Sequence, residues 1–354
     1  MAVGRRIEYL DGLRGIAALA VVLQHTAETI MSCDPASVAL LRPGFVDFFN
    51  FGRFGVALFF LISGFVVPFS FKRPHPIQSF AISRIFRLYP AYWASLALAV
   101  ALFPALTGRS FTLLQVAANS TMAQAVFGQA DVIGAYWTLL IELAFYVLCA
   151  AIFAAGLLSD WRCLVAAALI CVATSLAMSA YAAVHGGHLP ANLFVNLAMM
   201  FLGALMRRGW LEQDHAARRM IVPTATIWAV SLLPILWMMP SQPDMPIEPL
   251  GFCLGYWMAL ATFVASSRWQ RLINHHLLAL GTISYSLYLF HGICVEILLA
   301  WMPPTTLPTD VAFACGLLAS SVATAVLAYR WIERPFISVG HAIVKRGLAF
   351  QAAR

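Results

Sequence analysis

The chain has 354 residues, of which 62% are hydrophobic and only 10% are charged, and its mean hydropathy is +0.83. A chain of this composition cannot bury its apolar surface inside a soluble globule, which indicates a polytopic helical membrane protein. The net charge of +7 does not indicate a nucleic acid partner, because the basic residues cluster in short loops as membrane topology requires. The seven cysteines form no CxxC pair, so neither a disulfide framework nor a metal site is expected.

Ten apolar runs are long enough to cross roughly 30 Å of hydrocarbon. They lie near residues 12–32, 54–71, 89–107, 136–157, 162–184, 190–206, 221–240, 248–267, 277–300 and 310–332. The segment 111–127 is too polar to span and is expected to form a surface or re-entrant helix. We expect residues 1–354 to form a single membrane domain, with a core over about 8–336 and a cytoplasmic tail over 337–354.

The basic residues predict the orientation of these spans. With the N-terminus in the cytoplasm, the outer segments contain only Arg42, Arg53 and Arg109, and the other nineteen basic residues lie inside or at the inner edge. An even number of spans returns the C-terminus to the cytoplasm. The sequence therefore predicts an all-α integral membrane protein with about ten transmembrane helices and both termini cytoplasmic. Its expected location is the plasma membrane, which is the inner membrane of a bacterium.

The first apolar run carries an arginine and a histidine, Arg14 and His25, within the stretch EYLDGLRGIAALAVVLQH. Their separation is about three helical turns, so in a helix both side chains project from one face, roughly 16 Å apart along the axis. Arg14 would lie at a membrane edge and His25 near the midplane, where an ionisable group is costly and indicates function. A purely structural histidine is the alternative for His25.

Few other ionisable residues lie inside the predicted spans. Glu142 lies roughly 9 Å below the outer edge and His291 roughly 21 Å from the inner edge, so both reach one depth in a core of roughly 30 Å. Glu28 reaches that depth too, which makes a polar cluster in the outer half of the membrane feasible. Two alternatives stay open: His291 bonds structurally to a backbone carbonyl, and Glu142 with Tyr146 joins two helices.

A basic pair precedes the third run, in the stretch SRIFRLYPAYW. Arg84 and Arg87 share a helix face at i and i+3, directly before Pro90, on the predicted cytoplasmic side. Two guanidinium groups there suit a diphosphate or a ribose phosphate, because each offers a planar fork of donors. The alternative is that both are topogenic charges in contact with anionic lipid.

In their order and spacing, these stretches resemble the acyltransferase-3 family of integral membrane acyltransferases, from about Glu8 to Phe336. The resemblance begins with the spacing of Arg14 and His25 and with FGVALFFLISGF, which contains Ser63 and Gly64. It continues with the RxxRxxP of Arg84, Arg87 and Pro90 and with YWTLLIELAFY, which contains Glu142 and Tyr146. It ends with ISYSLYLFH, whose last residue is His291, and with IERP, which contains Glu333. The chain departs from the family's pattern at Leu140, Leu143 and Ala144.

The resemblance implies transfer of an acyl group, commonly acetyl from acetyl-CoA, to a hydroxyl of a glycan, glycolipid or other acceptor. His25 would act as base or acyl carrier, and the remaining catalytic positions would be Glu142, His291 and Arg14. The donor would contact Arg84, Arg87, Ser63 and Tyr146, and no permanently bound cofactor is implied. Expected partners are acyl-CoA, the acceptor and membrane lipids, and homo-oligomers are left open. We expect a stand-alone form without a fused extracytoplasmic hydrolase-like domain.

A secondary transporter is the alternative from another functional class. In that interpretation the buried histidines and glutamate form a proton relay or substrate site. Transporters of this kind are expected to show paired broken helices or inverted internal repeats, and the sequence contains neither. The acyltransferase interpretation is therefore favoured.

Overall fold

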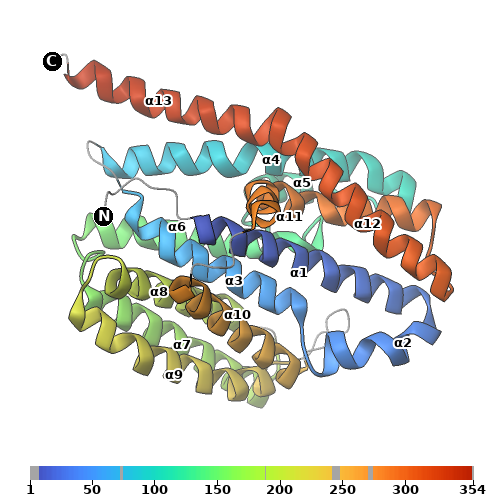
Figure 1. The fold of residues 1–354 in the computed structure, drawn as a ribbon, viewed down its shortest axis with the longest axis horizontal. Helices are drawn as coiled ribbons and strands as arrows, with labels where there is room; N and C mark the ends of the chain where they lie inside the picture. The colour runs from blue at the N-terminus through green and yellow to red at the C-terminus, as the bar shows by residue number, and fades with distance from the viewer. Residues whose placement is uncertain (1–7, 72–74, 188, 241–247, 270–273, 353–354) are drawn as a thin grey trace. The chain divides into compact units, whose positions relative to one another are not determined.

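The computed structural model describes residues 8–71, 75–187, 189–240, 248–269 and 274–352, and all regular elements within them are helical (Figure 1). In chain order they are α1 (Glu8–Cys33), α2 (Pro35–Arg42), η1 (Pro43–Asp47), α3 (Phe51–Val66), η2 (Val67–Phe69), α4 (Pro76–Thr107), α5 (Leu113–Ser120), η3 (Gln124–Phe127), η4 (Gly134–Tyr136), α6 (Trp137–Ala154), α7 (Trp161–His185), α8 (Ala191–Trp210), α9 (His215–Met238), α10 (Pro249–Trp269), α11 (His275–Trp301), α12 (Leu307–Ala328), η5 (Tyr329–Glu333) and α13 (Arg334–Ala352). Some basic residues of the orientation argument, among them Lys72, Arg73 and Arg271, lie outside the described residues.

Nine helical stretches in the described part of the chain are long and apolar enough to cross a membrane. Each of the ten predicted spans coincides with a helix, and α8 is the one missing from those nine. Two asparagines and two arginines, Asn192, Asn196, Arg207 and Arg208, lower the hydropathy of α8. Most of its residues are buried against protein, so this helix does not need a lipid-facing apolar surface. The all-α membrane fold class is confirmed.

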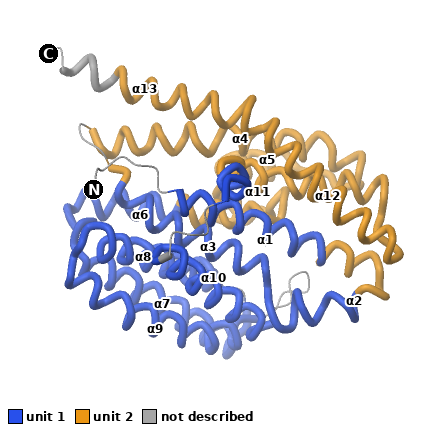
Figure 2. The backbone as a smooth tube through the Cα atoms, in the orientation of Figure 1, with its two compact units in different colours: residues 1–27, 38–69, 144–281 blue, residues 28–37, 70–143, 282–354 orange. Residues whose placement is uncertain are grey.

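The chain forms two compact units, each assembled from three separate segments (Figure 2). Unit 1 contains residues 1–27, 38–69 and 144–281, and unit 2 contains residues 28–37, 70–143 and 282–354. The boundaries fall inside α1, α2, α6 and α11, so each of these helices contributes residues to both units.

Unit 1 is a helical bundle with α8 at its centre. Helix α8 contacts α3, α7 and α9, and α10 packs against α3 and α9; the neighbouring helices α7 to α10 can be followed in Figure 1. Every residue from Val195 to Met206 is buried, whichever face of α8 it occupies. A helix that is apolar all round is stable only inside such a bundle, which explains its central position.

Helices of unit 1 approach one another most closely at glycines. A Cβ atom on Gly64 of α3 would collide with the carbonyl of Met200 in α8, and Gly203 of α8 lies just as tightly against α3. A Cβ atom on Gly55 of α3 would collide with the carbonyl of Ala17 in α1. Small residues allow helix backbones to touch, so the glycines of the FGVALFFLISGF motif are packing positions.

Helix α4 of unit 2 is longer than the predicted span. It runs without interruption through Pro90 and Pro104, and its first half, which was expected to precede the membrane segment, is helical as well. Helix α13 packs along α4, and a Cβ atom on Gly340 would lie 2.7 Å from the Cβ of Phe86. The predicted tail over 337–354 therefore begins within α13, which is helical as far as Ala352.

The polar segment 111–127 folds back along α4, as a re-entrant segment does. Three aromatic side chains of α4 donate hydrogen bonds to carbonyls at the end of this segment's helix: Tyr89 to Thr121 at 3.1 Å, Tyr92 to Asn119 at 2.5 Å and Trp93 to Ser120 at 2.9 Å. These aromatics precede the end of α4 by 14 to 18 residues, which is roughly 21 to 27 Å of helix. The segment therefore returns over about half of α4 before the chain enters α6.

Candidate active site

The eight predicted site residues divide equally between the two units. Unit 1 holds Arg14, His25, Ser63 and Tyr146. Unit 2 holds Arg84, Arg87, Glu142 and His291. The four residues of unit 1 lie on α1, α3 and α6, and the four of unit 2 lie on α4, α6 and α11.

His25 is half-buried on α1, directly after a buried glutamine that joins α1 to the start of α3. The Oε1 atom of Gln24 accepts hydrogen bonds from the backbone N–H groups of Phe51 at 2.9 Å and Gly52 at 3.4 Å, and its Nε2 donates to the Phe45 carbonyl at 3.1 Å. Amides in the first turn of a helix have no partner within that helix. His25 is therefore held beside a capped helix start. The sequence analysis did not single out Gln24, although a long amide side chain within an apolar run could have indicated buried hydrogen bonds.

Arg14 lies on α1 near its beginning and forms an ion pair with a carboxylate one turn earlier. Its Nη1 atom is 3.2 Å from Oδ1 of Asp11, which is buried. Helix α1 is continuous from Glu8–Cys33, so the backbone places Arg14 and His25 on one helix face, as their spacing predicts. The ion pair restrains the direction of the arginine side chain along that face.

Arg53, which the orientation argument assigns to an outer segment, is buried in the structure. It belongs to the first turn of α3 and only 7% of its surface is exposed. Its guanidinium carbon lies 4.5 Å from the ring centroid of Phe252, and the guanidinium hydrogen-bonds the hydroxyl of Tyr256. That hydroxyl donates to Oδ1 of Asn196 at 3.0 Å. A buried cation with this network contributes to the packing of unit 1.

His291 is buried on α11 in unit 2, with 2% of its surface exposed. Its Nδ1 atom lies 2.7 Å from the backbone carbonyl oxygen of Tyr288. A carbonyl oxygen only accepts hydrogen bonds, so Nδ1 carries a proton. The open alternative from the sequence, a histidine bonded to a backbone carbonyl, is therefore observed. The bond fixes the orientation of the imidazole ring on α11.

Three elements of unit 2 hold the α11 segment around His291. The Tyr288 hydroxyl donates to the Ala135 carbonyl at 2.8 Å and lies 2.8 Å from Oγ1 of Thr138. Ser95 of α4 donates to the Leu289 carbonyl at 3.0 Å. Because η4, α6 and α4 all contribute, the position of the imidazole is fixed by buried hydrogen bonds on two sides of α11.

The same contacts set the register between α6 and α11. A Cβ atom on Gly292 would lie 3.0 Å from Ile133, while Thr138 pairs with Tyr288, so the two chains run antiparallel here. From the Thr138–Tyr288 contact, Glu142 is four residues onward and His291 three residues onward, in opposite directions. That the two residues reach one depth in the membrane stays a prediction.

A buried carboxylate contacts α11 in unit 2. Glu333, in the π-helical turn η5, is 2% exposed and accepts a hydrogen bond from Ser286 at 2.7 Å. Sequence reasoning considered only acids inside predicted spans and so passed over Glu333 as a site residue. The signal was present in the IERP motif, and π-helical turns frequently occur at functional positions.

Arg84 and Arg87 lie one turn apart on α4, as predicted, and both are half-buried. The Nη2 atom of Arg84 donates to Oγ of Ser70 at 2.7 Å, and its guanidinium carbon lies 5.2 Å from the ring centroid of Phe80. A hydroxyl and a ring therefore orient the guanidinium plane of Arg84. Such an oriented, solvent-accessible fork is suited to binding a phosphate group.

Ser63 and Tyr146 occupy positions that contacts with α8 stabilise. Ser63 is half-buried and precedes Gly64, whose backbone touches α8. Tyr146 is buried, and the adjacent Phe145 packs edge to face on Phe201 of α8 with ring centroids 5.2 Å apart. Both residues are therefore held by the same central helix of unit 1.

The chain is similar to acyltransferases over most of its length. A family model described as an acyltransferase domain matches residues 7–330. Nodulation protein 10 of Rhizobium leguminosarum bv. viciae is 26% identical, with 96% of this chain and 95% of the relative covered. The membrane-bound transacylase BcsY of Komagataeibacter xylinus is 29% identical, with 92% of this chain and 81% of the relative covered. No solved structure matches the chain.

The family match and the fold agree on the same class of protein. The motifs that carry the resemblance lie on the helices that build the two units, with Gly55 and Gly64 at close helix contacts and His291 and Glu333 in buried hydrogen bonds. From the match over residues 7–330 and the apolar helices, we conclude that the protein belongs to the acyltransferase-3 family and is a multi-pass membrane acyltransferase.

Proposed function

We propose that the protein transfers an acyl group, most simply acetyl, from acyl-CoA to a hydroxyl of a saccharide or another hydroxyl-bearing acceptor at the membrane. The family match over residues 7–330 carries this proposal, and the name of the Komagataeibacter xylinus relative, a transacylase, supports acyl transfer. The proposed orientation has the N-terminus and the arginine pair Arg84 and Arg87 in the cytoplasm, where acyl-CoA is available. The donor is a substrate, and the proposal includes no resident cofactor.

An alcohol is a weak nucleophile and needs a positioned base, for which a neutral imidazole is well suited. In direct attack, His25 takes the proton of the acceptor hydroxyl as its oxygen attacks the thioester carbonyl. The carbon–sulfur bond then breaks and the proton passes to the CoA sulfur, which leaves an ester and a free thiol. In a covalent route, His25 first accepts the acyl group from CoA and then passes it to the alcohol.

The other predicted residues receive supporting roles in this proposal. Arg14 orients the face of α1 that carries His25, and Ser63 and Tyr146 line the path of the donor. His291, oriented by its hydrogen bond with the Tyr288 carbonyl, would carry out a second proton transfer. Glu142 would stabilise by its charge the imidazolium that forms when the histidine base takes a proton, in the manner of the acid in a catalytic triad.

Release of thiol from acetyl-CoA by the purified protein tests the proposal directly. The full chain in detergent is incubated with acetyl-CoA and an oligosaccharide or glycolipid fraction from the host membrane. We expect free CoA to appear together with an acylated product, and mass spectrometry of surface glycans to show loss of the same modification when the gene is deleted. Uptake of a substrate into vesicles without release of CoA would favour the transporter alternative.

A further inference from the structure

Arg207 lies near the end of α8, where this helix is in close contact with the end of α3 in unit 1. The contact is set by glycines one to two turns earlier: Gly64 lies against Met200, and a Cβ atom on Gly203 would be 2.5 Å from the Leu61 oxygen. With the two backbones this close, a long side chain one turn after Gly203 reaches across the last turn of α3. The glycine contact therefore determines where the guanidinium group lies.

Two aromatic rings and one carbonyl surround the guanidinium of Arg207. Its central carbon lies 4.5 Å from the ring centroid of Phe69 and 5.7 Å from that of Phe65. Its Nη1 donates a long hydrogen bond of 3.4 Å to the Phe65 carbonyl, while Nε is buried and has no hydrogen-bond partner in the described part of the chain. No ion pair between described residues includes Arg207.

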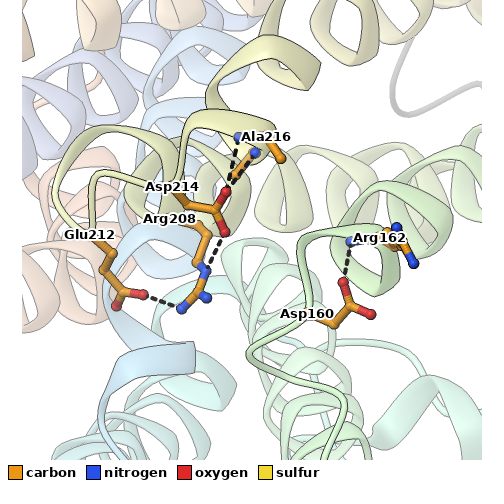
Figure 3. A network of polar contacts seen from close by, with 7 residues as sticks. Asp160, Arg162, Arg208, Glu212, Asp214 and Ala216 are labelled. Atoms are coloured by element: carbon orange, nitrogen blue, oxygen red, sulfur yellow. Dashed lines mark hydrogen bonds and ion pairs between the residues drawn. The ribbon is translucent and has the colours of Figure 1, made fainter.

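The next residue shows how this fold neutralises an arginine whose role is structural. The Nη1 of Arg208 lies 2.6 Å from Oε2 of Glu212, and its Nε lies 3.1 Å from Oδ2 of Asp214 (Figure 3). Asp214 also caps the start of α9 by accepting from the backbone N–H groups of Ala216 and Ala217. Two carboxylates therefore balance Arg208, whereas Arg207 has longer-range interactions with Glu212 and with the phenol of Tyr9 and no ion pair within the described residues.

A guanidinium that is partly desolvated without a paired anion is unfavourable, and an external anion would offset this cost. Flat rings beneath the guanidinium restrict its plane and leave the outer edge with its N–H donors for a ligand. Planar forks of this kind bind phosphate oxygens with charge-assisted bonds. The charge distribution predicts that this end of α8 faces the cytoplasm, where phosphate-bearing donors and lipid headgroups are both present.

We propose that Arg207, stacked on Phe69 and Phe65, is a phosphate-binding residue of unit 1. Its ligand carries a phosphate ester or diphosphate, which is the chemistry shared by CoA and by an anionic lipid headgroup. Where the ligand is CoA, this inference rests on the proposed function. Where it is a lipid, the site is independent of the acyl-transfer reaction.

The test compares Arg207→Gln with Arg219→Gln in the full chain purified in detergent. Both variants lose one positive charge from the same end of unit 1, but Arg219 is exposed at the start of α9 and outside the aromatic contact. CoA is titrated by calorimetry, and retention of phosphatidylglycerol is measured by native mass spectrometry. We expect Arg207→Gln to weaken at least one of these ligands about tenfold or more, and Arg219→Gln to leave both unchanged.

Each outcome decides the inference. Weaker CoA binding identifies the donor phosphate, and loss of phosphatidylglycerol alone identifies a lipid headgroup. If the wild-type chain binds no CoA, the donor part of the proposed function fails, while the lipid measurement still decides the role of Arg207. If Arg207→Gln does not fold, Arg207→Lys and Phe69→Leu replace it, and each should weaken the same ligand because the fork or the stacked ring is lost. Unchanged binding of both ligands in the folded variants would overturn the proposal.

Discussion

Gly203→Ala is expected to destabilise unit 1 through a clash with a helix backbone. The added Cβ would lie 2.5 Å from the Leu61 oxygen and 3.1 Å from the Phe65 nitrogen, and since real Cβ contacts stay above 3.0 Å, α3 and α8 must separate by at least 0.5 Å. Such a gap removes about a quarter of the dispersion attraction across the contact. Overpacking costs about 3 kcal/mol at a site that cannot relax, and the helix preference of alanine returns about 1 kcal/mol, so a net loss of about 2 kcal/mol is expected.

The matched control is Gly316→Ala in α12, where the new Cβ would be 3.5 Å from Met302 and 3.8 Å from Leu298. These are ordinary contacts with flexible side chains, so alanine should leave stability unchanged or raise it by up to about 1 kcal/mol. Apparent melting temperatures of the purified proteins in detergent, at one scan rate, give the comparison. Equal melting temperatures for the two variants would show that the tight contact between α3 and α8 does not exist.

Two further predictions concern unit 2. Arg84→Ala or Arg87→Ala should raise the KM for acyl-CoA about tenfold or more, because a charge-assisted bond to phosphate contributes about 1.5 to 3 kcal/mol. Lysine should restore affinity only in part, and unchanged saturation by acyl-CoA in both folded alanine variants would favour the lipid-anchoring role. Burial raises the pKa of Asp131, although a hydrogen bond from Gln124 opposes the shift, so the ionised carboxylate is unfavourable in the folded state. Asp131→Asn should therefore increase thermal stability above the raised pKa, and this gain should disappear below the unfolded value of about 3.8; a gain independent of pH would contradict this explanation.

The number and order of the long helices could be predicted from the sequence because apolar length is a local property. Residues 12–32 and 310–332 coincide with α1 and α12 for this reason. The same local measure does not reveal that Arg53 is buried, with Phe252 and Tyr256 as its neighbours. Residues distant in the chain supply those neighbours, and no window of sequence contains them.

The sequence predicts which residues belong to the candidate site, but it does not predict which of them are in contact. Arg14 and His25 share a helix face because one helix carries both. To compare the depths of Glu142 and His291, the register between α6 and α11 must be known. The hydrogen bond between Thr138 and Tyr288 contributes to that register. Depth counted from a predicted span edge cannot supply this register, because α4, for example, begins well before its predicted span.

The rate of CoA release by purified His25→Ala tests the proposed acyl-transfer chemistry most directly. The matched control is His185→Ala, because His185 is exposed and packs only on Tyr181 of its own helix. With acetyl-CoA and acceptor present, loss of a general base or acyl carrier should reduce turnover by about two to four orders of magnitude. The control should retain the wild-type rate. Near-normal release of CoA by folded His25→Ala would remove His25 from the mechanism and contradict the proposed chemistry.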